Sequence, residues 1–428
     1  MSEANSRAGL VERLAREGYL SPAWRDAFTR VDRERFVPDR VWVRDGDGYR
    51  PVNRATDPAR WLSLVHDDQA LVTQVEDDPT DTGADTDTDA DADTGAGAEG
   101  TTAGNSAAAL VPTSSASMPR VVATMLDALA VADGMKTLEI GTGTGYNAAL
   151  LAQRLGEQHV VSVEADPRVA DTARANLKAA GHSPTVVTGD GTLGCPDRAP
   201  FDRVISTCAL HAVPYALVEQ TVPGGLIVLP WGTGLYNGVL LRLTVADDGT
   251  RTAGGPVIGD CAFMWNRYET PERNVMATVR RASPDRATAT RTALDPRLVF
   301  GDEDATFTAG VMVPDCRYSV GHGPDGAFTL WLADHATGSW ASVDYVPGAD
   351  EFTARQSGPR GLWGEVEAAY AWWRDHDAPE RTRFGLTVTS TGQFLWLDTP
   401  DRPVPVNRPV PVDKSAPADG PGPVPPRP

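Results

Sequence analysis

The feature that most constrains the fold of this chain is a glycine-rich loop between a short apolar strand and a helix. The strand is Thr137-Leu138-Glu139-Ile140, and the loop continues as Gly141-Thr142-Gly143-Thr144-Gly145-Tyr146 before an apolar helical stretch. Glycines at such a junction let the backbone approach a ligand, and the N–H groups that begin the helix face it. The pattern indicates a nucleotide-type site, although a glycine-rich turn by itself also fits a simple tight turn.

Short apolar strands alternate with helices around this loop. The predicted strands are 137–140, 160–164, 185–188, 203–206, 226–229, 239–245, 328–332, 384–389 and 393–397, and the predicted helices are 9–36 with a break at Ser21-Pro22, one begun by Pro119, 148–155, 167–180, 215–221 and 363–373. In the central part, this alternation is typical of a parallel sheet covered on both faces. We therefore predict an α/β fold, in which a doubly wound Rossmann-like core carries an additional C-terminal α+β domain.

Composition divides the chain into five expected parts. Residues 1–75 form the N-terminal helical and extended part of the catalytic unit, 113–255 its core, and 256–398 an α+β accessory domain with a hypothesised role in peptide recognition. The segment 76–112 has ten acidic residues and no basic or aromatic residue, and the tail 399–428 has eleven prolines. Neither can bury enough apolar area to offset the entropy of ordering, so we predict both to be disordered.

Three carboxylates follow the pattern of the predicted sheet. Glu139 lies on the strand before the loop, Glu164 ends the next strand, and Asp190 lies in Gly189-Asp190-Gly191 after the third. Carboxyl ends of adjacent parallel strands meet at one edge of a sheet. We expect Glu164 to accept hydrogen bonds from two ribose hydroxyls there, and Asp190 to accept one from an adenine amino group.

The expected cofactor is S-adenosyl-L-methionine. NAD, the competing nucleotide, is typically bound by Gly-x-Gly-x-x-Gly, but Tyr146 occupies the place of the third glycine. Carboxylates beside the ligand favour a positively charged sulfonium over a pyrophosphate. Each residue taken alone also has an explanation without a ligand: Glu139 as a strand end that faces water, and Glu164 as an acidic residue that precedes a helix. The residues predicted to bind the cofactor are Ser115, Glu139, Gly141, Thr142, Gly143, Gly145, Tyr146, Glu164, Gly189, Asp190, Gly191 and Thr207.

Further motifs surround the glycine-rich loop. They are Arg35-Phe36-Val37-Pro38, Ser117-Met118-Pro119, Gly189-Asp190-Gly191, Ala199-Pro200-Phe201-Asp202 and Pro223-Gly224-Gly225. Together with the loop they resemble the protein-L-isoaspartate O-methyltransferase family over roughly residues 8–245. The loop is shared by many methyltransferases, whereas Ser-x-Pro before a helix combined with Gly-Asp-Gly is far more diagnostic.

This resemblance implies a chemistry. A side-chain carboxylate of aspartate or isoaspartate attacks the methyl group, and because it is ionised at neutral pH, no strong base is required. Alignment then supplies most of the catalysis, up to ~7–11 kcal/mol in well-oriented systems. The resemblance implies Ser117 as the catalytic residue, whose hydroxyl positions the substrate carboxylate. Capping of the helix begun at Pro119 remains open as a second role. A lone histidine such as His211 is more typical of a surface or supporting position than of a base in this reaction.

The chain is longer than the family's repair enzymes, since about 180 residues follow the matching part. Extended relatives in actinobacteria resemble tailoring enzymes for ribosomally made peptides such as lanthipeptides, graspetides and lasso peptides. The resemblance therefore implies methylation of Asp or isoAsp in a modified peptide, leading through a methyl ester to succinimide (aspartimide) and isoaspartate. Repair of isoaspartate in aged proteins is the alternative. A donor-binding regulator without turnover and a small-molecule methyltransferase are further hypotheses, and the last does not explain Ser-x-Pro.

The C-terminal part is rich in tryptophan. These side chains suit either a peptide-binding surface or a core, and the core is the commoner place. The residues are Trp331, Trp340, Trp363, Trp372, Trp373 and Trp396.

Charge and cysteine usage limit the partners. A net charge of −19 argues against nucleic acid and against an anionic membrane surface. No apolar run is long enough to span a membrane, and no His or Cys cluster has metal-ligand spacing, so neither a membrane nor a metal is expected. Four scattered cysteines fit a reducing cytoplasm. The expected partner is a peptide or protein carrying Asp or isoAsp, and the oligomeric state stays open.

Overall fold

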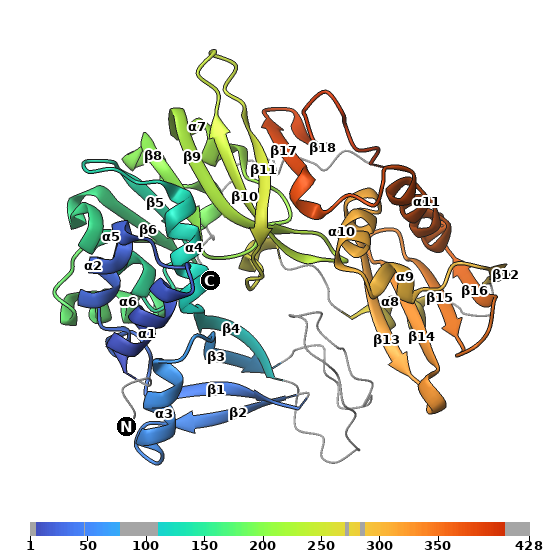
Figure 1. The fold of residues 1–428 in the computed structure, drawn as a ribbon, viewed down its shortest axis with the longest axis horizontal. Coiled ribbons are helices and arrows are strands. Elements are labelled where there is room, and N and C mark those ends of the chain that lie inside the picture. Colours follow the sequence, from blue (N-terminus) through green and yellow to red (C-terminus); the bar gives the residue numbers. More distant parts are fainter. Residues whose placement is uncertain (1–5, 47, 78–109, 270–273, 283–286, 407–428) are drawn as a thin grey trace, which may run out of the picture.

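A computed structural model of the chain describes residues 6–46, 48–77, 110–269, 274–282 and 287–406. A nine-stranded sheet lies at its centre, and a four-stranded and a five-stranded sheet lie on two sides of it (Figure 1). The nine-stranded sheet carries the glycine-rich loop, so its topology fixes where the expected site lies.

The central sheet has the order β18-β17-β11-β10-β9-β8-β5-β6-β7. Its strands are β5 (Thr137–Ile140), β6 (Val160–Glu164), β7 (Thr185–Thr188), β8 (Phe201–Ser206), β9 (Thr221–Gly232), β10 (Asn237–Val245), β11 (Ala253–Asp260), β17 (Phe384–Thr389) and β18 (Gly392–Leu397). Strands β5 to β9 pair in parallel, and β10, β11, β17 and β18 extend the sheet with antiparallel pairs. The strand order reverses at β5, which is the point where such sheets bind ligands. The predicted Rossmann-like α/β core is confirmed.

Helices cover both faces of this sheet. On one face lie α1 (Arg7–Arg16), α2 (Pro22–Arg30), α4 (Pro119–Leu129), α5 (Tyr146–Leu155) and α6 (Pro167–Ala179), and on the other lies α7 (Tyr215–Glu219). Neighbouring strand residues show the division, because side chains alternate between faces along a strand. Ile205 and Val228 belong to the core of the first helices, whereas Val204 and Ile227 belong to the core shared with α7.

The N-terminal part forms its own small sheet. It has the order β2-β1-β3-β4, and α3 packs on it through an apolar core that contains Trp61. The elements are β1 (Arg40–Asp45), β2 (Gly48–Asn53), α3 (Pro58–Val65), β3 (Leu71–Asp77) and β4 (Leu110–Ala116). The bounds expected for the acidic loop, 76–112, include too many residues at each end, because residues 76–77 and 110–112 are paired in β3 and β4. The predicted disorder of 78–109 lies outside the described residues.

The C-terminal part contains a five-stranded antiparallel sheet of order β12-β16-β15-β14-β13. Its elements are α8 (Val275–Arg281), β12 (Thr288–Thr292), α9 (Arg297–Phe300), α10 (Glu303–Met312), β13 (Cys316–His322), β14 (Phe328–Asp334), β15 (Ser339–Tyr345), β16 (Phe352–Ser357) and α11 (Leu362–Asp375). Short 3₁₀ turns are η2 (Arg33–Arg35), η3 (Glu157–His159), η4 (Gly191–Leu193), η5 (Pro196–Arg198), η6 (Arg267–Glu269), η8 (Pro324–Gly326) and η9 (Arg381–Arg383). Of the six tryptophans expected in core or surface, Trp340, Trp363, Trp373 and Trp396 are buried and the other two are partly buried, so the core interpretation holds.

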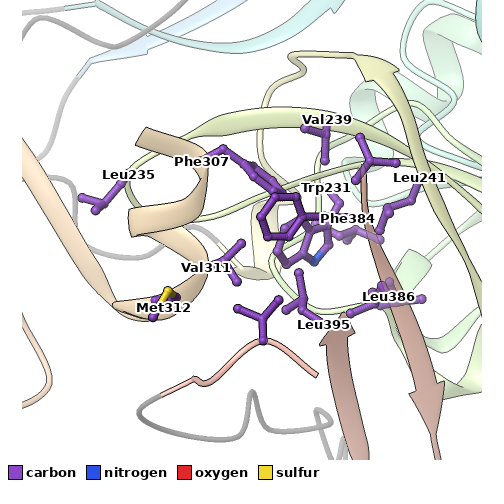
Figure 2. Packing of buried hydrophobic residues seen from close by; sticks show 14 of the residues in the cluster. Trp231, Leu235, Val239, Leu241, Phe307, Val311, Met312, Phe384, Leu386 and Leu395 are labelled. Carbon is purple, nitrogen blue, oxygen red and sulfur yellow. The ribbon is translucent and has the colours of Figure 1, made fainter. Parts of the chain in front are cut away.

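The accessory part is not separated from the core at residue 256 as expected. That boundary falls inside β11, and β17 pairs with β11 while β18 forms the sheet edge. Phe307 of α10 meets Trp231 at 6.2 Å and Phe384 at 5.2 Å between ring centroids (Figure 2). The reason is that β11 would otherwise leave a row of backbone groups unpaired at an edge.

The beginning of the proline-rich tail also packs against the fold. The N–H of Val404 donates to the carbonyl of Leu395 at 2.9 Å, and the Val404 side chain is buried. The prediction of a disordered tail is therefore wrong for residues 399–406, and residues 407–428 lie outside the described residues.

Candidate donor-binding site

A cavity open to solvent, with about 950 Å³ of space, lies beside the carboxyl ends of β5 and β6. The glycine-rich loop and the end of β6 form its floor, and residues 113–117 at the end of β4 form one side. Residues 263–268, after β11, form another side. The cavity therefore lies at the reversal of strand order, where the sequence predicted the site.

Two glycines of the loop are required for different reasons. Gly141 has φ +89°, and a Cβ there would lie 2.8 Å from Oγ1 of Thr207. At Gly143, with φ +54°, a Cβ would meet nothing closer than the Ser115 carbonyl at 3.7 Å, so this backbone faces open space. Gly145 does not line the cavity but packs against α6, where Leu177 lies 3.2 Å from an added Cβ.

Glu164 brings a buried carboxylate to the cavity. Its Oε2 accepts a hydrogen bond from the Gly143 N–H at 2.8 Å, and its Oε1 accepts one from the Asp166 N–H at 3.1 Å. A carboxylate has about four acceptor sites, so further hydrogen bonds from a ligand can be accommodated. Its negative charge also suits a cationic ligand.

Glu139 lies behind the cavity and does not line it, which corrects the expectation that it faces the ligand. Its carboxylate accepts from Nδ2 of Asn147 at 2.7 Å and from the Ser162 hydroxyl. Burial raises the pKa of Glu139 to about 7, against the opposing effect of these hydrogen bonds. Asn147, in the first turn of α5, does line the cavity, so Glu139 is in contact with a cavity residue through that amide.

Asp190 is also used locally. Its Oδ1 accepts from the Thr192 N–H at 2.9 Å and from the Thr192 hydroxyl at 2.7 Å, and so begins the η4 turn. Within the Gly-Asp-Gly motif only Gly191 lines the cavity, and Gly189 and Asp190 do not. Gly191 packs against β5, where a Cβ would lie 2.4 Å from Cγ2 of Ile140. The assignment of Asp190 to an adenine amino group remains a prediction.

The remaining predicted cofactor residues line the cavity, and several hold its walls together. Thr142 shares a hydrogen bond with Ser162 at 2.6 Å, and the Thr207 hydroxyl donates to the Gly141 carbonyl. Tyr146 packs its ring 5.7 Å from that of Phe36, and burial raises its pKa to about 12. Ser115 lines the cavity from β4.

Ser117 lines the cavity immediately before α4. The N-cap residue of α4 is Met118, whose side chain makes no cap hydrogen bond, and it is the Asp68 carboxylate that accepts from the Arg120 N–H in the first turn, at 2.8 Å. Ser117 is therefore not the N-cap residue of α4, and the capping role that the sequence left open for it is wrong. The Ser117 carbonyl accepts a hydrogen bond from Nη2 of the buried Arg33 at 2.9 Å.

Sequence reasoning missed the wall formed by residues 263–268. Trp265 stacks on the ring of His211 with centroids 3.6 Å apart, and Arg267 donates to Asp166 at 3.3 Å and to the Thr113 carbonyl at 3.4 Å. The sequence signal that could have indicated this wall is the group of aromatic residues that follows β11, namely Phe263, Trp265 and Tyr268. His211 lies outside this cavity. Its pKa is lowered to about 4, mainly by burial and to a smaller extent by the positive charge of Arg317. It is neutral at physiological pH and supports Trp265, as its lone position suggested.

These walls suit the charge and the mixed polar and apolar character of S-adenosylmethionine. The Gly143 backbone faces open space, the Glu164 carboxylate is available to a cation, and Ile140 and Phe263 supply apolar surface. In the described part of the chain, no cluster of three or more His, Cys, Asp or Glu residues could hold a metal ion. Among those same residues, no helix is long and apolar enough to cross a bilayer.

A parallel sheet with a glycine-rich loop and a carboxylate at its reversal point is typical of nucleotide-binding enzymes with a Rossmann-like fold, the class to which many methyltransferases belong. Residues 103–254 match the family model described as protein-L-isoaspartate(D-aspartate) O-methyltransferase. A protein-L-isoaspartate O-methyltransferase of Methanococcoides burtonii is 43% identical over 144 residues, which cover 33% of this chain and 71% of the relative. One of Hyperthermus butylicus is 33% identical over 281 residues, covering 62% of this chain and 92% of the relative.

This chain belongs to the protein-L-isoaspartate O-methyltransferase family, and it is an S-adenosylmethionine-dependent enzyme. A solved structure of a protein-L-isoaspartate O-methyltransferase aligns with 92% of this chain and 100% of its own, at 20% identity and a TM-score of 0.49.

Proposed function

We propose that this enzyme methylates the side-chain carboxylate of an Asp or isoAsp residue in a ribosomally made, modified peptide. The neighbouring backbone nitrogen then attacks the carbonyl carbon of the methyl ester, methanol leaves with the amide proton, and the resulting succinimide is opened by water to aspartate or isoaspartate. This would place the chain with the extended, peptide-tailoring members of its family, such as those that act on lanthipeptides. Its partner is then the peptide, and its compartment the cytoplasm, which suits four free cysteines.

The residues of the cavity divide the work of such a reaction. When bound, S-adenosylmethionine supplies a methyl group that a carboxylate oxygen can accept, so a strong base is not needed. We assign the donor side to the Gly143 backbone and Glu164, with Glu139 orienting Asn147. We assign the substrate side to Ser117, whose hydroxyl would donate to the substrate carboxylate and hold it in line. Catalysis is then chiefly alignment.

The observation that carries the peptide-tailoring proposal is a second cavity next to the first. It is open to solvent, has about 1140 Å³ of space including that opening, and lies between the end of β9, α10 and the end of β14. His211 lines this cavity and stacks on Trp265, which lines the donor cavity. Its apolar lining includes Val275, Val311 and Leu395, so it suits a side chain of a folded peptide held beside the donor.

A second candidate function is repair of isoaspartate in aged proteins. The names of the Methanococcoides burtonii and Hyperthermus butylicus relatives favour it. A generalist of this kind needs only a shallow site, and it would leave the second cavity without a role in catalysis.

The test is a methylation assay with three substrates, read by mass. They are an isoaspartyl test peptide, a linear precursor peptide encoded near the gene, and that precursor after cyclisation. We expect the cyclised precursor alone to gain the mass of one methyl ester. Where the ester has already released methanol and closed to the succinimide, the peptide should instead be lighter than the starting precursor by one water. Methylation of the isoaspartyl peptide with no reaction of the precursor would support repair instead. Donor binding without methylation of any peptide would support a regulator. Ser117→Ala is the control, and it should lower methylation while donor binding persists.

A further inference from the structure

Arg33 is a buried cation whose hydrogen-bond partners are all backbone carbonyls among the described residues. It lies in η2, between α2 and β1, and is 2% exposed. Its Nη1 donates to Val65 at 2.7 Å and Asp67 at 3.4 Å. Its Nη2 donates to Gln69 at 3.1 Å, Ala116 at 3.3 Å and Ser117 at 2.9 Å.

A buried guanidinium without a carboxylate in contact is unusual, because burial of a charge normally demands an ion pair. Burial lowers the pKa of Arg33 to about 10, and Tyr146, Asp68 and Asp67 oppose that change from a distance. The five carbonyl dipoles therefore solvate the charge in place of water. Such an arrangement fixes the position of every carbonyl in it, since each is needed to hold the cation.

Two of these carbonyls belong to the substrate side of the donor cavity. Ala116 and Ser117 join β4 to α4, and both line the cavity. The Asp68 carboxylate accepts from the Arg120 N–H at 2.8 Å in the first turn of α4, but it does not reach the carbonyls of Ala116 and Ser117. Arg33 is the group that links these two carbonyls to residues 65–69. If this link were lost, the partly buried Ser117 carbonyl would lose its hydrogen bond to Arg33, and the peptide unit would be free to rotate.

We propose that Arg33 is a positioning residue for methyl transfer, which acts by fixing the backbone of Ser117. This rests on the proposed function, because it takes the Ser117 hydroxyl as the group that holds the substrate carboxylate. A shift of about 1 Å at such a group can cost ~10²-fold in rate. Lysine cannot replace the guanidinium here, because one ammonium cannot donate to both sets of carbonyls at once.

The experiment compares Arg33→Lys with a matched control, Arg203→Met. Arg203 donates to the Leu129 carbonyl at 2.8 Å and the Ala130 carbonyl at 3.1 Å, at the opposite end of α4. Hydrogen exchange of residues 113–118 should be at least ~10-fold faster in Arg33→Lys and unchanged in Arg203→Met. Donor affinity should stay within about threefold of wild type. Unchanged exchange at 113–118 would overturn the inference, and this readout needs no substrate.

Turnover tests the link to Ser117 by a double-mutant cycle. We expect Arg33→Lys to lower kcat by ~10–100-fold in the wild-type background and by less than about twofold in the Ser117→Ala background. Equal losses in both backgrounds would show a general structural role and overturn the inference. Failure of the proposed function is seen separately, as unchanged turnover in Ser117→Ala. Should Arg33→Lys not fold, Arg33→Gln takes its place, and unfolding of both would also count against a role specific to Ser117.

Discussion

The carboxylate of Glu164 accepts a hydrogen bond from the backbone N–H of Gly143, with 2.8 Å between Oε2 and N, and so ties the end of β6 to the glycine-rich loop. Glu164→Gln keeps the shape but removes the charge and one acceptor. We expect donor affinity to fall by ~10–100-fold, since a charged hydrogen bond is worth about 1.5–3 kcal/mol. Calorimetry with S-adenosylmethionine and its neutral product S-adenosylhomocysteine should show the larger loss for the cation. Equal affinity of Glu164→Gln and the exposed control Glu12→Gln would contradict the assignment.

Gly143→Val should weaken donor binding by at least ~10-fold, because a side chain at φ +54° strains the loop and occupies the space beside it. Gly134→Val is the matched control, because Gly134 has φ +81° with no atom within 4 Å of an added Cβ. Both variants should lose stability to a similar degree, and only Gly143→Val should lose donor affinity. A similar affinity loss in the two variants would show that strain alone is responsible.

Glu139 should make the stability of the enzyme depend on pH. Its pKa is raised from 4.5 to about 7 in the folded chain, so the folded state binds the proton more tightly than the unfolded state. The stabilisation is fully present below about pH 4.5 and is lost as the pH rises towards 7. By linkage, up to roughly 3 kcal/mol of unfolding free energy is lost across this window. Glu139→Gln should remove that part of the slope in urea unfolding at pH 5 and pH 8, and an unchanged slope would refute the assignment.

A chain cut after residue 255 should not fold to a native state. The cut removes the second half of β11 together with β17 and β18, and it uncovers Trp231, which packs against Phe307. Loss of large buried aromatic contacts costs about 3–5 kcal/mol each, which is a large part of typical stability. The full chain should show one thermal transition for the core and the C-terminal part. A soluble 1–255 fragment that binds the donor would disprove this prediction.

The central sheet was predictable because each parallel strand is a short segment rich in apolar or β-branched residues and bounded by turn residues. The strands 137–140, 160–164 and 185–188 have the bounds that the sequence indicated. The pairing of β11 with β17 was not predictable, because Gly254 and Thr387 meet across a long sequence separation that leaves no local periodicity. The additional C-terminal α+β part is therefore present, but the boundary expected at residue 256 falls inside β11.

The candidate site shows the same limit at the level of side chains. Motif spacing placed Glu164 and the loop at one rim, and both line the cavity. Spacing could not show that Glu139 is bound by Asn147 and Ser162, since its direction depends on the packing of α5. Arg33 and Arg35 are the same residue type in the same short turn, so the sequence does not distinguish them, yet only Arg33 is buried.

The use of β17 and β18 as the last strands of the central sheet has a consequence for biosynthesis. Residues 384–397 are synthesised more than a hundred residues after β11, so β11 must wait with an unpaired edge while those residues are added. Open edges of this kind recruit other strands and promote aggregation. The nascent enzyme should therefore need a holding chaperone, and its yield in heterologous hosts should improve at low growth temperature.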